Sequence, residues 1–131
     1  MLSCHQSIQY YLTNLKPKIF NTNEQSALNT VSIRQQTGGS TQTSVDSNFF
    51  VFSCGISGEN FVFSSHFPTD NTRKACNTAC LEGGTTNPTT ANGYWLRTAY
   101  NGLCFFVDGS GLPQSNGTGL KGIRPMFVIS L

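Results

Sequence analysis

From Tyr94 to Leu131 the sequence reads YWLRTAYNGLCFFVDGSGLPQSNGTGLKGIRPMFVISL, and its pattern is that of an antiparallel sheet. Tyr94–Thr98 and Leu103–Val107 are short runs of aromatic and aliphatic residues, which favour strands. Asp108–Gly111 follows the second run, and a glycine-rich sequence that begins with aspartate is typical of a turn. We therefore expect two strands and a turn at the start of this segment.

The rest of the segment predicts a long loop and a closing strand. Gln114–Gly122 is polar and interrupted by glycines, which indicates a loop. Ile123–Ile129 is mostly apolar, and Pro125 within it is compatible only with an edge strand or a bulge. We therefore expect the end of the chain to be a β meander that contains one long loop.

A helix is expected near the start of the chain, over Ser7–Phe20. Its apolar residues recur at offsets of three and four, which places them on one helical face: Ile8, Tyr11, Leu12, Leu15 and Ile19. Ser7 is a suitable N-cap, and Pro17 is expected to end or kink the helix.

The middle of the chain predicts shorter elements. We first expect a helical turn at Asn23–Ala27, a strand at Val31–Ile33 and a flexible polar loop at Gln35–Ser47. A buried strand at Asn48–Ser53 and a helical turn at Glu59–Phe63 are expected next. A second helix is expected at Thr72–Glu82, starting near Thr69 or Asp70 and ending at Gly83-Gly84, and a polar loop follows at Thr85–Gly93. Helices first and a meander last define an α+β domain.

Composition limits the function classes. The 131 residues are expected to form one domain over 1–131, and the ten Phe provide core anchors that a disordered chain lacks. The net charge is only +2 and the basic residues are scattered, so we expect no nucleic-acid partner. The N-terminal sequence lacks the pattern of a signal peptide, and the apolar runs are too short to enter a membrane.

The cysteines predict neither a disulfide framework nor a metal site. The five are irregularly spaced, at Cys4, Cys54, Cys76, Cys80 and Cys104. An odd number without regular spacing favours reduced, buried thiols. Cys76 and Cys80 have the spacing of half a zinc site on a helix, but no second pair of ligands follows. We therefore expect no metal and no cofactor.

Several motifs together resemble a family of domains found in phages and gut bacteria. The two family motifs usually read W-W-L-R-S-P and G-V-R-P-A, and the matching residues here are Tyr94–Arg97 and Gly122–Pro125. Between them the family has a valine followed by a glycine-containing turn, matched by Val107 and Asp108–Gly111. Upstream matches are Tyr11–Asn14 followed by Phe20, Phe49–Ser53, and Arg73–Ala75 leading to Asn92–Gly93. The resemblance covers nearly the whole chain.

The resemblance implies a C-type-lectin-like fold with two helices, a small twisted antiparallel sheet and long loops. This branch of the fold includes formylglycine-generating enzymes and the variable proteins of diversity-generating retroelements. In the variable proteins, the segment between the two arginine motifs is diversified and contacts the ligand. The resemblance therefore implies a non-catalytic recognition domain for a protein or cell-surface receptor, carried on a phage virion or a bacterial surface.

The chain departs from the family pattern at two places. It begins close to the first family helix, so we expect the strand that normally precedes that helix to be missing, and Ala99 stands where the family has proline. An unpaired sheet edge favours association with another chain. An alternative function is therefore a structural or assembly module, in which a second copy or a partner chain completes the sheet.

The resemblance divides the last segment into framework and ligand-binding residues. The framework residues are Trp95, Arg97, Arg124 and Pro125, because a large aromatic ring and guanidinium groups in apolar strands are typical of structural anchors. The expected ligand-binding residues are Tyr100, Asn101, Leu103, Phe105, Asp108, Leu112, Gln114, Ser115, Asn116, Thr118 and Leu120. Alternation places Leu103, Phe105 and Val107 on one strand face and Cys104 and Phe106 on the other, and leaves open which face is exposed.

Catalysis is not expected. The six carboxylates are dispersed along the chain, and neither His5 nor His66 has a nucleophile next to it in sequence. Leu112–Gln114 is not a calcium-dependent sugar motif, and Asp108 is the only carboxylate nearby. The second alternative function, an enzyme like the formylglycine-generating group, would use a reactive cysteine pair, whereas Cys104 stands alone in this region.

Overall fold

The computed structural model describes residues 4–38, 41–76, 91–100, 102–119 and 121–130. The helices are α1 (Cys4–Ile19), α2 (Thr22–Ser26), the 3-10 helix η1 (Ile56–Gly58), α3 (Phe63–His66) and α4 (Asp70–Arg73). The strands are β1 (Leu28–Asn29), β2 (Val31–Gly38), β3 (Thr41–Ser47), β4 (Phe50–Val51), β5 (Ala75–Cys76), β6 (Ala91–Asn92), β7 (Tyr94–Tyr100), β8 (Leu103–Val107), β9 (Pro113–Gln114), β10 (Pro125–Met126) and β11 (Val128–Ile129). The chain is thus a small α+β domain with small antiparallel sheets.

Helix α1 confirms the helix expected near the N-terminus, with different bounds. It begins before Ser7, so Ser7 lies inside the helix and does not cap it. Pro17 lies within the last turn, and the helix continues to Ile19. Ile8 and Leu12 are buried in the core, but Tyr11 and Ile19 are exposed. The buried stripe is therefore narrower than the sequence period predicts.

The polar segment expected as a flexible loop, Gln35–Ser47, is instead most of a β-hairpin. Strands β2 and β3 pair antiparallel in a register that places Ile33 opposite Val45 and Gln35 opposite Thr43. Ile33 is buried, and the remaining pairs are largely Thr, Ser and Gln. Hydroxyl and amide side chains hide the alternating pattern, although threonine suits a strand and cross-strand contacts add stability.

The segment between the hairpin and β7 also differs from the sequence expectation. The strand expected at Asn48–Ser53 is only β4, and the turn expected at Glu59–Phe63 is replaced by η1 before it and α3 at its end. The second helix expected at Thr72–Glu82 is only α4, which Thr69 caps. Lys74 is already extended and leads into β5, which pairs with β6. Pairing with a distant segment thus overrides the local helical pattern, and residues 77–90 lie outside the described part.

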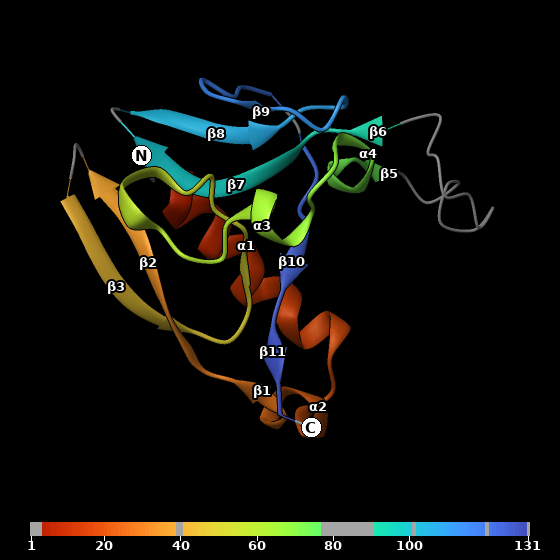
Figure 1. Cartoon of the computed structure of the whole chain (residues 1–131). Helices are drawn as coiled ribbons and strands as arrows, with labels where there is room; N and C mark the ends of the chain where they lie inside the picture. The colour runs from red at the N-terminus through yellow and green to blue at the C-terminus, as the bar shows by residue number, and fades with distance from the viewer. Residues whose placement is uncertain (1–3, 39–40, 77–90, 101, 120, 131) are drawn as a thin grey trace.

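Strands from the last part of the chain form the three-stranded sheet of the domain. β7, β8 and β9 pair antiparallel in that order, and the predicted strand Leu103–Val107 has the bounds of β8. The closing strand expected at Ile123–Ile129 is split, because β10 pairs with β4 whereas β11 pairs with β1. In Figure 1, β7, β8 and β9 lie at one end of the molecule, and β10 and β11 run toward the opposite end, where α2 and β1 lie.

Strand β7 lies at the centre of the packing, next to α1, β2 and β4. One core cluster contains Phe52, Phe63, Tyr94, Leu96 and Val107, and a second contains Ile8, Leu12, Phe49 and Val51. Both faces of β7 are therefore covered, and its polar residues must find partners inside the protein.

Candidate functional site

The guanidinium of Arg97 is buried and hydrogen-bonds to backbone carbonyls in three separate segments of the chain. Its Nη1 donates to the carbonyl of Val51 at 2.8 Å, and its Nη2 donates to the carbonyls of Asn60 and Arg34, the latter at 3.3 Å. β7 bulges here, and the Arg97 N–H donates to the carbonyl of Phe52 at 2.9 Å. Burial lowers the pKa of Arg97 to about 10, and the charge of Glu59 opposes this shift, so the guanidinium is charged at neutral pH.

Two buried polar residues beside Arg97 were missed by the sequence reasoning. The Thr98 hydroxyl donates to the Glu59 carboxylate at 2.5 Å and accepts the Cys54 N–H at 2.8 Å. Thr98 and Glu59 are 0% and 4% exposed, so this network does not open to solvent. We infer that it holds the chain between β4 and α3 against β7. The available signal was weak, since Glu59 follows a glycine in an otherwise apolar stretch.

Arg124 is a second structural anchor. Its guanidinium lies 3.8 Å from the centroid of the Phe67 ring and donates to the Tyr94 hydroxyl at 3.3 Å. That hydroxyl in turn donates to the carbonyl of Arg73 at 2.7 Å. Pro125 begins β10 and stands opposite Val51. These contacts join the end of the chain to α4 and β7.

Trp95 is half-buried and supports the loop that follows β9. Its ring lies 6.1 Å from that of Phe106, edge to face, while the Lys121 ammonium lies 5.3 Å from the Trp95 ring centroid and 4.1 Å from that of Phe106. Trp95 also packs against the second core cluster, as Ile123 does. The loop lies against this aromatic pair at Gly117, whose N–H donates to the Cys104 carbonyl at 2.8 Å.

Asp108 holds the turn between β8 and β9. Its carboxylate accepts the N–H groups of Ser110 and Leu112 at 2.9 and 3.0 Å and the side-chain amide of Gln114 at 3.0 Å. Burial tends to raise the pKa of Asp108, but these hydrogen bonds outweigh it, and the net shift is downward. Gly111 packs directly against the backbone of Asp70 with φ at +85°, where a side chain would be strained and would collide.

The predicted ligand-binding residues fall into two groups. Five are exposed on the segment after this turn: Leu112, Gln114, Ser115, Asn116 and Thr118. Tyr100, Leu103, Phe105 and Asp108 are half-buried, and Asn101 and Leu120 lie outside the described residues. Phe105 packs against the core cluster that contains Val107, whereas Phe106 faces Trp95. We name residues Leu112–Thr118 the exposed loop.

The cysteines correct one expectation. Cys104 is disulfide-bonded, so the expectation of reduced thiols fails there. Spacing along the chain does not report which sulfurs meet in space. Cys54 is free, and burial, followed by the charge of Glu59, raises the pKa of its thiol. A thiol with a raised pKa is a poor nucleophile, and Cys104 is not a free thiol in this structure.

Other chemical groups are dispersed over the described residues. His66 is exposed, and its Nδ1 lies 3.1 Å from the carbonyl of Val62. Within residues 4–38, 41–76, 91–100, 102–119 and 121–130, no three His, Cys, Asp or Glu side chains gather as metal ligands would. None of the helices in these ranges has the length and apolar character needed to cross a bilayer.

Fold and site together define a small α+β domain in which Asp108 and the Trp95–Phe106 pair hold an exposed polar loop. A family model with the description "Domain of unknown function (DUF6273)" matches residues 5–131, so the chain belongs to that family. Neither a curated protein nor a solved structure matches the chain.

Proposed function

We propose that this chain is a non-catalytic recognition domain with a C-type-lectin-like arrangement, and that the exposed loop contacts a protein or a cell-surface receptor. The observation that carries the proposal is that an exposed stretch is held in one conformation. Asp108 fixes its beginning, and Gly117 seats its end on Trp95 and Phe106. A loop that is ordered before binding loses little conformational entropy when it binds.

The side chains of the exposed loop suit this role. Ser115, Asn116 and Thr118 offer amide and hydroxyl groups, which donate and accept hydrogen bonds without a fixed charge. Leu112 is 44% exposed and adds apolar contact area. Adaptable polar groups around an apolar anchor are typical of protein-binding surfaces.

The contacts of buried Arg97 and half-buried Arg124 support a non-catalytic role. Arg97 and Arg124 hydrogen-bond to other residues of the protein, so neither guanidinium is available to a substrate. Since the contacts of Arg97 and Arg124 do not involve the exposed side chains of the loop, substitutions in the loop leave these contacts in place. Diversification of this segment, which the resemblance implies, is therefore part of the proposal, as is display on a phage virion or a bacterial surface.

Labelling of bacterial cells with the fluorescent chain tests recognition. The triple variant Ser115→Ala, Asn116→Gly, Thr118→Ala is expected to lose on the order of tenfold or more in affinity for cells that the wild type labels, because the lost side-chain hydrogen bonds lie at the interface. Flow cytometry over a concentration series measures this loss.

The matched control removes three exposed polar side chains from α2, in the variant Thr22→Ala, Asn23→Ala, Ser26→Ala, and it is expected to label cells like the wild type. Both variants must keep the wild-type circular dichroism spectrum. Equal labelling by the wild type and the loop variant would show that the exposed loop is not the recognition surface.

A further inference from the structure

The two outer edges of the β2–β3 hairpin differ in their hydrogen bonds to the rest of the chain. On the β2 side, the Arg34 N–H donates to the Asn60 side chain at 2.8 Å, and the same side chain donates to the Ser32 carbonyl at 2.9 Å. Arg97 donates to the Arg34 carbonyl. The outer edge of β2 is therefore occupied by side chains that replace a neighbouring strand.

These contacts determine the direction of the backbone groups in β3. Because the backbone groups of Ser32 and Arg34 point away from β3, these two residues belong to non-hydrogen-bonded pairs. Their partners are Asp46 and Ser44, respectively. The N–H and C=O groups of Ser44 and Asp46 therefore point away from β2. Over the described residues nothing pairs with them, and both residues are exposed.

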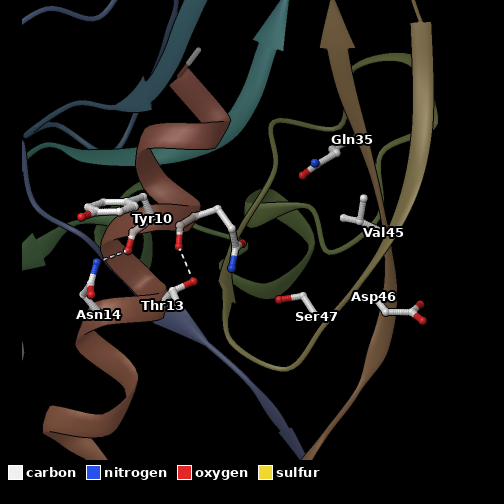
Figure 2. Close-up of a pocket in the computed structure, with 8 residues that line it drawn as sticks. Tyr10, Thr13, Asn14, Gln35, Val45, Asp46 and Ser47 are labelled. Carbon is white, nitrogen blue, oxygen red and sulfur yellow. Dashed lines mark hydrogen bonds between the residues drawn. The ribbon is translucent and has the colours of Figure 1, made fainter. Parts of the chain in front are cut away.

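A groove of about 500 Å³ lies beside this open edge, between α1 and the hairpin. Tyr10 of α1 and Val45 of β3 contribute apolar surface, with 68% and 38% of each residue exposed. Figure 2 shows Gln35 pointing from β2 into the groove. Gln35 is only 9% exposed, and its side chain lines the groove. Its amide therefore offers a hydrogen-bond donor and an acceptor to a ligand in the groove.

We propose that β3 accepts an extended peptide segment of a partner protein as an added strand, and that the groove receives its side chains. An added strand satisfies the outward backbone groups of Ser44 and Asp46, and its alternate side chains enter the groove beside Val45. The Gln35 amide both donates and accepts, so it pairs with a peptide group or an amide side chain of the incoming segment.

The charges around the groove specify the peptide further. Among the described residues that line the groove, only Asp46 is charged, and Figure 2 shows its carboxylate directed away from α1. The groove therefore favours an uncharged side chain. On the opposite face of the hairpin, Asp46 favours a lysine or arginine in the added strand, since oppositely charged cross-strand neighbours attract. This site lies on β3 and α1, and it does not depend on recognition by the exposed loop.

A peptide selection tests the proposal on the whole chain. The probe is a phage-displayed library of random heptapeptides, selected on the immobilised wild type. Asp46→Pro removes the outward N–H and leaves the β2–β3 ladder intact, as proline is tolerated at a sheet edge. Asp46→Ala is the matched control, because it keeps the N–H. Titration of the 15N-labelled wild type with a selected peptide gives a readout that does not depend on any variant folding.

The expected result is that selected peptides bind the wild type, bind Asp46→Ala at most a few-fold more weakly because only the charge attraction is lost, and bind Asp46→Pro on the order of tenfold more weakly than Asp46→Ala. Titration is then expected to shift the amide signals of Ser44 and Asp46 and to slow their hydrogen exchange. The proposal is overturned if no peptide is enriched, if signals elsewhere shift instead, or if sedimentation shows that the edge is occupied by a second copy of the chain.

Discussion

Replacing Arg97 by methionine is expected to lower the free energy of unfolding by about 3–5 kcal/mol, because it removes a buried charged donor that several carbonyls share. The carbonyls of Val51, Asn60 and Arg34 would lose their hydrogen bonds from the guanidinium. Each buried acceptor left without a donor costs about 1–3 kcal/mol. Since domains of this size have total stabilities of about 5–15 kcal/mol, much of the stability is at risk.

Urea denaturation followed by circular dichroism measures this loss. Arg34→Met is the matched control, because the Arg34 side chain is exposed and the change is expected to stay within about 0.5 kcal/mol. Arg97→Lys is expected to fall between the two, since an ammonium keeps the charge but does not span the same carbonyls. Wild-type stability in Arg97→Met would contradict the role of Arg97 as the central tie of the frame.

Replacing Gly117 by alanine is expected to displace the exposed loop from Trp95 and Phe106. An added Cβ would lie 2.5 Å from the Trp95 ring and 2.8 Å from the Phe106 ring, which is closer than packed atoms approach. Overpacking of this kind costs about 1–3 kcal/mol. Since Trp95 is the only tryptophan, its fluorescence reports the displacement directly.

The control for this variant is Gly119→Ala. A Cβ at Gly119 meets nothing within 4 Å, so only backbone strain at its φ of +78° is expected, and the emission of Trp95 should not change. Thermal unfolding and emission spectra of both variants distinguish a steric effect at Gly117 from a general effect of removing glycine. If Gly117→Ala keeps the wild-type emission and melting temperature, the loop does not rest on the aromatic pair as described.

The parts of the fold that depend on local patterns were predicted from the sequence. Strand β8 was predicted with its bounds, since Leu103–Val107 is an apolar run next to a turn. The helical period predicted α1, but not its start at Cys4. A structural role for Arg97 and Arg124 was expected, because a guanidinium in an apolar strand needs many acceptors, and it stays a prediction for the variants above to test.

The parts that depend on distant partners were not predicted. The β2–β3 hairpin is polar, so its alternation is hidden, and its stability depends on Ile33, Asn60 and Arg97. β5 is a strand only because β6 pairs with it. The buried network of Thr98 and Glu59 joins residues far apart in the chain. Contacts of this kind leave no periodic trace in a single sequence.

From the sequence, the candidate site was predicted as one continuous segment. In the structure, its described residues divide into exposed and half-buried ones. The exposed members lie in Leu112–Thr118, whereas Phe105 packs against the core and Asp108 is occupied in holding the turn. Gly111 and Gly117 were not singled out, because the need for glycine arises from close packing against Asp70 and Trp95 rather than from the sequence around them.

Sequencing the gene across its source population tests most directly whether an exposed loop on a fixed frame is the recognition surface. We expect amino-acid differences to concentrate at the five exposed positions: Leu112, Gln114, Ser115, Asn116 and Thr118. Asp108, Gly111 and Gly117 are expected to stay unchanged, together with Arg97. Substitutions spread as evenly over the exposed loop as over α1, or frequent substitutions at Arg97 and Gly117, would contradict this account.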